Sequence, residues 1–191
     1  RERRVYSKIN GGPESAIYKS EDAGKTWRKL GKGLPKGDVG RIGLALSPAN
    51  ADILYAVIEL PDNKGGFYRS VDRGESWEKR SNKVSGSPQY YNEVYADPKN
   101  PDLVILMDTR NALSSDGGKT WKNIEGDNKH VDNHVIWINP DNTDHYLVGC
   151  DGGLYETYDR AETWQFKSNL PITQYYHVRT DNDSPFYNVY G

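Results

Sequence analysis

Residues 114–121 read SSDGGKTW, and three other stretches of the chain repeat this pattern. They read SEDAGKTW at 20–27, SVDRGESW at 70–77 and TYDRAETW at 157–164. The shared frame, called the box below, is Ser/Thr-x-Asp-x-Gly-x-Thr/Ser-Trp, with Ala161 replacing the glycine in the last copy. Its aspartates, at positions 22, 72, 116 and 159, are spaced by 50, 44 and 43 residues. Such a period is typical of a repeat architecture.

The segments between the boxes also align, with the same order of short strands and turns. RIGLALSPANADILYAVIE (41–59), NEVYADPKNPDLVILM (92–107) and HVIWINPDNTDHYLVG (134–149) each read as strand, proline-containing turn, strand. A short strand also precedes and follows each box, and no segment of adequate length has helical periodicity. Four short strands per unit of about 45 residues predict an all-β fold of β-propeller blades, each a four-stranded antiparallel sheet.

The chain holds about 4–4.5 such units and reads as part of a larger ring. The predicted boundaries are a partial blade at 1–38, full blades at 39–86, 87–128 and 129–171, and a partial blade at 172–191. The opening RRVYSKI (3–9) is expected to be the second strand of its unit, and YYHVRTDNDSPFYNVYG (175–191) the first two strands of another. A closed four-blade ring, completed by the last strands, is the alternative.

Composition excludes some function classes. The formal net charge is −2, so no broad basic field for nucleic acid is expected. A single cysteine, Cys150, allows no internal disulfide and reads as a small buried apolar residue. No apolar run approaches the length of a membrane span. The chain starts at Arg1 with no signal-peptide pattern, which suggests an excerpt from a longer protein.

Each box is expected to form the turn between the third and fourth strands of its unit. Asp and Ser side chains accept backbone N–H groups in such turns, glycine supplies positive φ, and the tryptophan buries apolar surface between sheets. Four equivalent turns on different blades cannot converge on one substrate, so a structural role is predicted. The residues assigned to it are Ser20, Asp22, Gly24, Trp27, Ser70, Asp72, Gly74, Trp77, Ser114, Asp116, Gly118, Trp121, Thr157, Asp159 and Trp164.

The four boxes resemble the Asp-box, or BNR, repeat of sialidases, xyloglucan-cleaving glycoside hydrolases and the sortilin (VPS10) propeller. Segments such as SGSPQYYNEVYADPKNPD (85–102) and GCDGGLYETYD (149–159) look closer to bacterial secreted propellers that are sortilin-like or labelled "glycosyl hydrolase". The resemblance implies a larger propeller that is secreted, periplasmic or at the bacterial cell surface. It does not fix an activity, because fold does not imply function.

The hydrolase activities of the resembled families need particular side chains. A sialidase-like site needs an Arg-Ile-Pro segment, and the nearest match, Arg41-Ile42-Gly43, lacks the proline. A xyloglucanase-like site needs two carboxylates across a cleft, one acid and one base. Asp132 and Asp108 are candidates, and nothing in the sequence singles them out as a pair.

Aligning the units on Pro48, Pro98 and Pro140 brings polar and aromatic residues to the start of the innermost strands. A polar, aromatic rim above apolar strands is typical of the entrance to a ligand-binding channel. The alternative is that these side chains only cap the strand ends. The predicted binding residues are Tyr90, Tyr91, Asn92, Asp132, His134, Gln174, Tyr175 and Tyr176.

The segment HVDNH (130–134) is the sharpest local feature. In an extended strand His130, Asp132 and His134 would share one face and could hold a divalent metal such as zinc or supply an acid–base group. Asp151 could approach them from the next strand. The alternative is a hydrogen-bonded polar cluster, and otherwise no cofactor is expected.

Three function hypotheses remain. The first is an extracellular or periplasmic binding scaffold for a protein, peptide or glycan. The second is a polysaccharide-acting glycoside hydrolase of the xyloglucanase-like type, with Asp132 among its carboxylates. The third is a structural module of a cell-surface assembly. In each case the rest of the propeller, or a partner chain, is expected to complete the ring.

Overall fold

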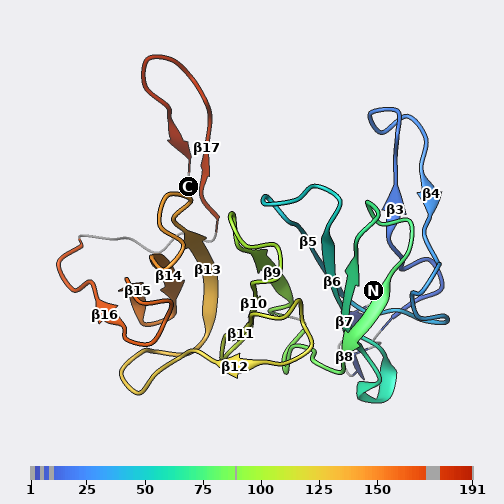
Figure 1. Ribbon diagram of the computed structural model, residues 1–191, viewed down its shortest axis with the longest axis horizontal. Coiled ribbons are helices and arrows are strands. Elements are labelled where there is room, and N and C mark those ends of the chain that lie inside the picture. The colour runs from blue at the N-terminus through green and yellow to red at the C-terminus, as the bar shows by residue number, and fades with distance from the viewer. Residues whose placement is uncertain (1–2, 5–6, 9–10, 89, 171–176, 191) are drawn as a thin grey trace.

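Antiparallel strand pairing dominates the computed structural model, which describes residues 3–4, 7–8, 11–88, 90–170 and 177–190 (Figure 1). Three four-stranded sheets, each a meander in chain order, form its body. The first contains β5 (Ile42–Leu46), β6 (Leu54–Ile58), β7 (Gly66–Ser70) and β8 (Glu78–Ser81). The second contains β9 (Glu93–Ala96), β10 (Val104–Met107), β11 (Ala112–Ser114) and β12 (Lys122–Asn123). The third contains β13 (Asn133–Ile138), β14 (Tyr146–Cys150), β15 (Gly153–Thr157) and β16 (Gln165–Phe166).

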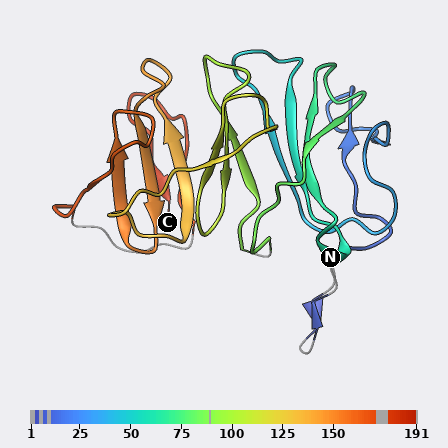
Figure 2. The same cartoon turned by 60° about the horizontal axis from the view of Figure 1, so that its bottom comes forward.

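Three two-stranded hairpins accompany these sheets. They are β1 (Arg3–Arg4) with β2 (Ser7–Lys8), β3 (Tyr18–Lys19) with β4 (Arg28–Lys29), and β17 (Arg179–Thr180) with β18 (Val189–Tyr190). The prediction that residues 3–9 form the second strand of a blade is wrong, because β1 pairs with β2 in a hairpin of its own, apart from the sheets in Figure 2. The boundaries between blades remain a prediction.

The only helix in the described part of the chain is a 3-10 turn, η1 (Pro61–Asn63). No helix within the described ranges is both long and apolar enough to cross a membrane. The structure is therefore all-β, as the strand-and-turn periodicity predicts.

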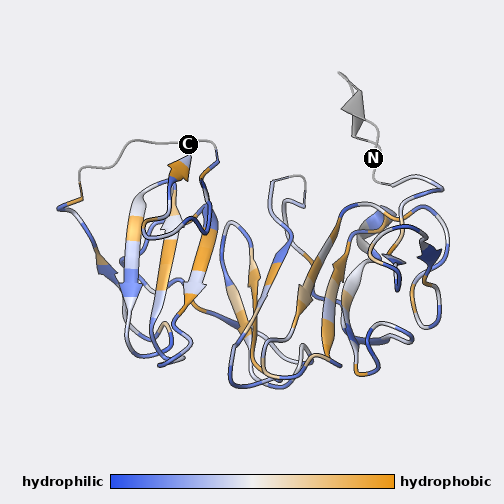
Figure 3. Cartoon of the chain, turned by 90° about the horizontal axis from the view of Figure 1, so that it is seen from above, coloured by the Kyte–Doolittle hydropathy of each residue, from blue (hydrophilic) through white to orange (hydrophobic). Residues whose placement is uncertain are grey.

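Three apolar clusters join the sheets face to face. The first lies between the β3–β4 hairpin and the first sheet, the second between the first and second sheets, and the third between the second and third. The second strands are therefore apolar on both faces, and all four residues of β10 are fully buried. Figures 2 and 3 show the sheets standing side by side, and the colours of Figure 3 show that hydrophobic residues gather on the strands of these sheets.

The boxes form the turns between the third and fourth strands, as predicted, with one shared hydrogen-bond pattern. In the second box, Ser70 Oγ donates to Asp72 Oδ1 (2.8 Å) and accepts from Gly74 N (2.8 Å). Asp72 also accepts from the amide and the hydroxyl of Ser76 (2.8 and 2.5 Å). The boxes beginning at Ser20, Ser114 and Thr157 repeat these contacts.

Two successive left-handed residues make the turn. Arg73 and Gly74 have φ of 59° and 84°, and the other boxes repeat the pair. In the last box Ala161 keeps φ at 68°, so the turn survives without its glycine. An L-residue is uncommon in this region, so the hydrogen bonds of the box hold a conformation that the alanine alone disfavours.

The tryptophan of each box faces the preceding sheet. Trp77 is 5% exposed in the first cluster, and Trp121 packs edge-on against Phe67 at a centroid distance of 4.8 Å. Trp164 donates from Nε1 to Ile124 O (2.8 Å). Trp27 differs: it is 63% exposed, because the described residues place no sheet before β3–β4 for it to cover.

Replacing the buried box tryptophan should destabilise the protein far more than replacing the exposed one. Trp77→Ala removes an indole from the first cluster and should lower the free energy of unfolding by about 3–5 kcal/mol. The matched variant Trp27→Ala should change it by no more than about 0.5 kcal/mol. Urea titrations followed by circular dichroism measure both, and equal effects would contradict the packing described.

The box aspartates should make stability depend on acid. Hydrogen bonds from Ser76 hold the pKa of Asp72 at about 2, and those from Thr26 and Thr163 do the same for Asp22 and Asp159. Because the pKa is lower in the folded protein than in the unfolded chain, each aspartate stabilises the fold fully at pH values above the ordinary carboxyl pKa. This contribution is lost as the pH falls through about 4 toward 2.

Asp72→Asn removes one such contribution. Its melting temperature should lie below that of the unmodified protein at neutral pH, and the gap should narrow toward about pH 2. Thermal melts across this range measure the gap, and a gap that widens in acid would refute the assignment.

Candidate functional site

The predicted binding residues that the structure describes gather where the innermost strands β9 and β13 begin. Tyr91, Asp132, His134 and Asp151 form one group, with Tyr90 beside it; these five residues are called the mouth cluster below. Tyr90 is 66% exposed, whereas Tyr91 is buried. The cluster therefore presents the exposed aromatic ring of Tyr90 next to polar side chains that contact one another.

Direct contacts tie the cluster together. Tyr91 donates from its hydroxyl to Asp132 Oδ1 (3.1 Å), and His134 Nε2 lies 2.7 Å from Asp151 Oδ1. The Tyr91 ring lies 5.6 Å from the His134 ring and 6.4 Å from the Tyr90 ring, measured between centroids. Both members of the His134–Asp151 pair are more than half exposed, so a ligand can reach them.

A β-bulge places His134. β13 begins at Asn133, and its pairing with β14 shifts register between Asn133 and Val135, so His134 is the extra residue. Asp132 precedes the strand with φ of 61°, in the left-handed region. The prediction that His130, Asp132 and His134 share one face of an extended strand is therefore wrong, because two of the three lie before the strand and the third is bulged.

The bulge also corrects the alignment of the units. Alignment on Pro98 and Pro140 places Asn92 opposite His134, each six residues before its proline, but Asn92 and Asn133 make the equivalent contacts. Asn92 Nδ2 donates to Arg41 O (3.2 Å) and Val57 O (3.4 Å) of the preceding sheet.

Asn133 Nδ2 donates to Asp108 O (3.2 Å) and Thr109 O (3.0 Å), again in the preceding unit. Both asparagines are at most 1% exposed. Asn92 therefore joins sheets rather than binding ligand.

A buried ion pair supports the start of β13. Lys129 Nζ lies 2.6 Å from Glu125 Oε2, and both side chains are at most 1% exposed. Glu125 Oε1 accepts from Asn133 Nδ2 (2.8 Å), and Lys129 also contacts Asn133 Oδ1. The ammonium lies 5.4 Å from the ring centroid of Trp164, a cation–π contact with the box tryptophan. The network fixes the strand end that carries Asp132 and His134.

Electrostatics distinguish the acidic groups near the mouth. Burial raises the pKa of Tyr91 to about 12, helped by its bond to Asp132, so the phenol stays a donor. Burial also raises the pKa of Glu93, while the Arg41 guanidinium and His134 act against it. Arg41 Nη2 lies 3.2 Å from Glu93 Oε1. Glu93 was not predicted from the sequence, because its partial burial, with 41% of the side chain exposed, depends on contacts with distant segments.

The metal hypothesis gains no support from the geometry. His130 Nδ1 lies 2.7 Å from the backbone oxygen of Val131, while His134 pairs with Asp151 and Asp132 with Tyr91. Within the described ranges no three His, Cys, Asp or Glu side chains are grouped so that they could hold an ion. The sequence-predicted set is thus divided among three separate contacts.

The remaining candidates lie elsewhere. Asp108 is buried and accepts from Gly86 N (2.7 Å) and Thr109 N (2.8 Å), so it braces two loops. Cys150 is a free, partly buried thiol whose pKa burial raises, which fits an unreactive residue. Three further predicted binding residues fall outside the described ranges: Gln174, Tyr175 and Tyr176.

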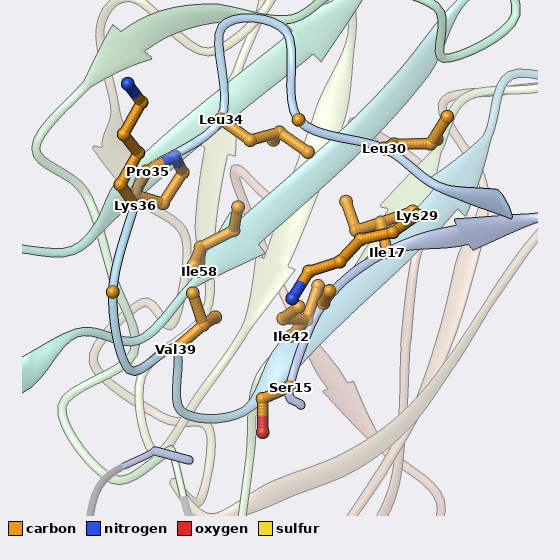
Figure 4. Close-up of a pocket in the computed structure, with 13 residues that line it drawn as sticks. Ser15, Ile17, Lys29, Leu30, Leu34, Pro35, Lys36, Val39, Ile42 and Ile58 are labelled. Carbon is orange, nitrogen blue, oxygen red and sulfur yellow. The ribbon is translucent and has the colours of Figure 1, made fainter. Parts of the chain in front are cut away.

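A separate cavity of about 440 Å³ lies between the β3–β4 hairpin and the first sheet (Figure 4). Its lining is mostly apolar, with Ile17, Leu30, Ile42 and Ile58 among the residues. Lys29 and Lys36 are its charged lining residues, and no carboxylate lines it. It therefore lacks the pair of carboxyl groups that a glycoside hydrolase needs, and the mouth cluster is the better candidate site.

The architecture, sheets stacked face to face and joined by equivalent contacts, is that of a β-propeller. No protein-family model matches the chain. It is similar to a solved GH74 xyloglucanase from Xanthomonas campestris, with a TM-score of 0.58 at 18% identity over 89% of this chain and 29% of that one. At this identity the likeness establishes the fold.

Curated relatives point in the same direction. The chain is 24% identical to xyloglucanase Xgh74A of Acetivibrio thermocellus, over 87% of this chain and 23% of the relative. It is 26% identical to an oligoxyloglucan-reducing end-specific xyloglucanase of Emericella nidulans, over 83% and 23%. A vacuolar protein sorting/targeting protein 10 of Aspergillus flavus shares 38% identity over 31% of this chain and 4% of that protein. The chain thus spans about a quarter of the length of the xyloglucanases it matches.

Breaking the buried Lys129–Glu125 ion pair should destabilise the start of β13, which carries part of the mouth cluster. Lys129→Ala leaves the Glu125 carboxylate buried without its cation and should cost about 3–5 kcal/mol. The matched variant Lys122→Ala removes a lysine from an exposed pair and should cost less than about 1 kcal/mol. Chemical denaturation measures both, and a Lys129 variant as stable as the Lys122 variant would contradict the role of the network.

Proposed function

We propose that this chain is part of a polysaccharide-binding β-propeller that holds a glycan at the mouth cluster. The observation that carries the proposal is the exposed Tyr90 ring beside the fixed Tyr91–Asp132 and His134–Asp151 pairs. The apolar face of a sugar ring packs against an aromatic ring, and carboxylates accept its hydroxyl groups. The relatives named xyloglucanases support a glycan as the ligand.

Other ligands fit less of what is observed. A protein or peptide ligand has the relative named for protein sorting in its favour, but that likeness spans under a third of the chain. A purely structural module gives no reason for an open tyrosine above paired acidic groups. Since the proposed ligand is a polysaccharide, the protein is expected outside the cytoplasm: secreted, periplasmic or at the cell surface.

Hydrolysis of the bound polysaccharide is the second candidate function, and Glu93 is the observation that favours it. A carboxyl group acts as a general acid near neutral pH when its pKa is raised, and partial burial raises the pKa of Glu93, whose side chain is 41% exposed and lies 3.2 Å from the Arg41 guanidinium. Asp132 and Asp151 lie in the neighbouring cluster and would serve as the second carboxyl group.

We also propose that further blades complete the ring, from the same polypeptide or a partner. Leu44 and Leu46 are 51% and 58% exposed on the face of the first sheet that is directed toward the β3–β4 hairpin. Exposed apolar strand residues of this kind are covered by a neighbouring sheet where one is present, as Tyr55 and Val57 are on the opposite face.

Binding is tested with xyloglucan as the probe. Tyr90→Ala removes the open ring and should weaken binding about tenfold, since aromatic contacts contribute about 0.5–1.5 kcal/mol beyond their buried area. Tyr18→Ala, an exposed tyrosine distant from the mouth, should leave affinity unchanged. Calorimetric titration measures both. Equal affinities for the two variants, or no binding by the unmodified protein, would overturn the proposal.

Hydrolysis is tested on the same substrate. Glu93→Gln keeps the size of the side chain but removes the acid, so release of reducing ends should fall by about a hundredfold or more while binding persists. Glu78→Gln, on an exposed glutamate of β8, is the matched control. Unchanged release by the Glu93 variant would remove hydrolysis through this residue and leave the binding function standing.

A further inference from the structure

The dipeptide Asp-Gly occurs twice in the chain, at Asp116–Gly117 and at Asp151–Gly152. In such a dipeptide the glycine nitrogen can attack the carboxyl group of the aspartate, because glycine has no Cβ to obstruct the approach. The attack forms a cyclic imide, which water opens to aspartate or to isoaspartate. The folded chain holds the reacting groups of the two copies differently, so the copies form a matched pair.

Both reacting groups are held at Asp116. Its carboxylate accepts the hydroxyl group of Ser114 (2.8 Å) and both the hydroxyl group and the backbone N–H of Thr120 (2.6 and 3.0 Å). Gly117 N, the atom that would attack, donates to Asp102 O at 2.8 Å. These hydrogen bonds must break before the imide forms, so the box protects its own aspartate.

The reacting groups at Asp151 are held less firmly. Its carboxylate contacts His134, whose Nε2 lies 2.7 Å from Asp151 Oδ1, and both side chains are more than half exposed. The backbone N–H of Gly152 donates to the sulfur of Cys150, which is a weak acceptor. The attacking nitrogen is thus weakly held, and solvent reaches the carboxyl group.

Packing requires a glycine at this position. A Cβ added to Gly152 would lie 2.5 Å from His130 Cβ, closer than such atoms approach in folded proteins. A larger residue would displace His130 or the turn between β14 and β15. The Asp-Gly dipeptide is therefore required by the fold at a place where its aspartate is exposed.

We propose that Asp151–Gly152 is a site of spontaneous aspartate isomerisation, with His134 as the proton donor. A bond forms between Gly152 N and Asp151 Cγ, and the bond from Cγ to Oδ1 breaks. Oδ1 leaves as water, with the amide proton of Gly152 and one proton from the His134 imidazolium. Water then opens the imide at either carbonyl, which restores the amide and a carboxylate and releases one proton.

Isoaspartate changes the geometry of the site without a change in mass. Its main chain runs through Cβ and Cγ, so the backbone is longer by one carbon atom. Its carboxylate is attached directly to Cα and is displaced from His134. The inference rests on the chemistry of this turn and does not depend on the proposed function.

Peptide mapping of the aged chain tests the proposal. Trypsin places Asp116 in peptide 111–119 and Asp151 in peptide 130–160, and electron-transfer fragmentation locates isoaspartate within each peptide. In the folded chain isoaspartate should accumulate at Asp151 at least about tenfold faster than at Asp116. In the chain unfolded by guanidinium chloride the two rates should agree within about twofold, because the hydrogen bonds of the box are then absent.

Two variants test the chemistry. Asp151→Glu keeps the charge and should abolish the isomer in peptide 130–160, because a glutamate side chain closes the ring much more slowly. His134→Gln keeps a hydrogen-bond donor without a transferable proton, so it should slow isomerisation at Asp151 by at least about threefold. It should leave the rate at Asp116 unchanged. Protected amides in β14, measured by hydrogen–deuterium exchange, show that each variant is folded.

Three results would overturn the proposal. The first is an equal rate at Asp116 and Asp151 in the folded chain. The second is a difference between them that persists in the unfolded chain, since the local sequence and not the fold would then cause it. The third is an unchanged rate at Asp151 in the His134 variant.

Discussion

The carboxylate of the box aspartate is the contact on which each blade depends. It accepts the hydroxyl groups of the first and seventh residues of the box and a backbone amide of the turn, and so closes the loop between the outer strands. The closed turn directs the following tryptophan toward the preceding sheet, where Trp77 and Trp121 are packed. One short motif thus sets both the end of a sheet and its contact with the previous one.

The candidate site lies at the inner strands of the same sheets, on the edge opposite the outer strands that the boxes join. With the outer strands fixed by the boxes, the inner strands are held by asparagines that reach the preceding unit, Asn92 and Asn133. The Lys129–Glu125 pair fixes Asn133, and the bulge after it turns His134 toward Asp151. The buried contacts of Lys129, Glu125 and Asn133 therefore position His134 and Asp151, which are exposed and can contact a ligand.

The architecture could be predicted because it depends on local patterns in the amino-acid sequence, namely the spacing of the boxes and the strand–turn–strand segments between them. The sequence also predicted that Tyr91, Asp132 and His134 lie near one another, and the contacts among them agree, but it did not predict how they are arranged. The sequence carries no signal for the bulge at His134, so the prediction that alternate residues of 130–134 share one face of a strand was wrong. The raised pKa of Glu93 comes from partial burial, and the exposure of Trp27 comes from the lack of a covering sheet among the described residues. Both depend on contacts between distant segments.

The most direct test of the account is a nuclear magnetic resonance titration of the labelled chain with a xyloglucan oligosaccharide. The account predicts shifts concentrated at Tyr90, His134 and Asp151, with little change at the box aspartates. Shifts centred on the cavity around Ile17 and Leu30, or an unchanged spectrum at saturating oligosaccharide, would contradict it.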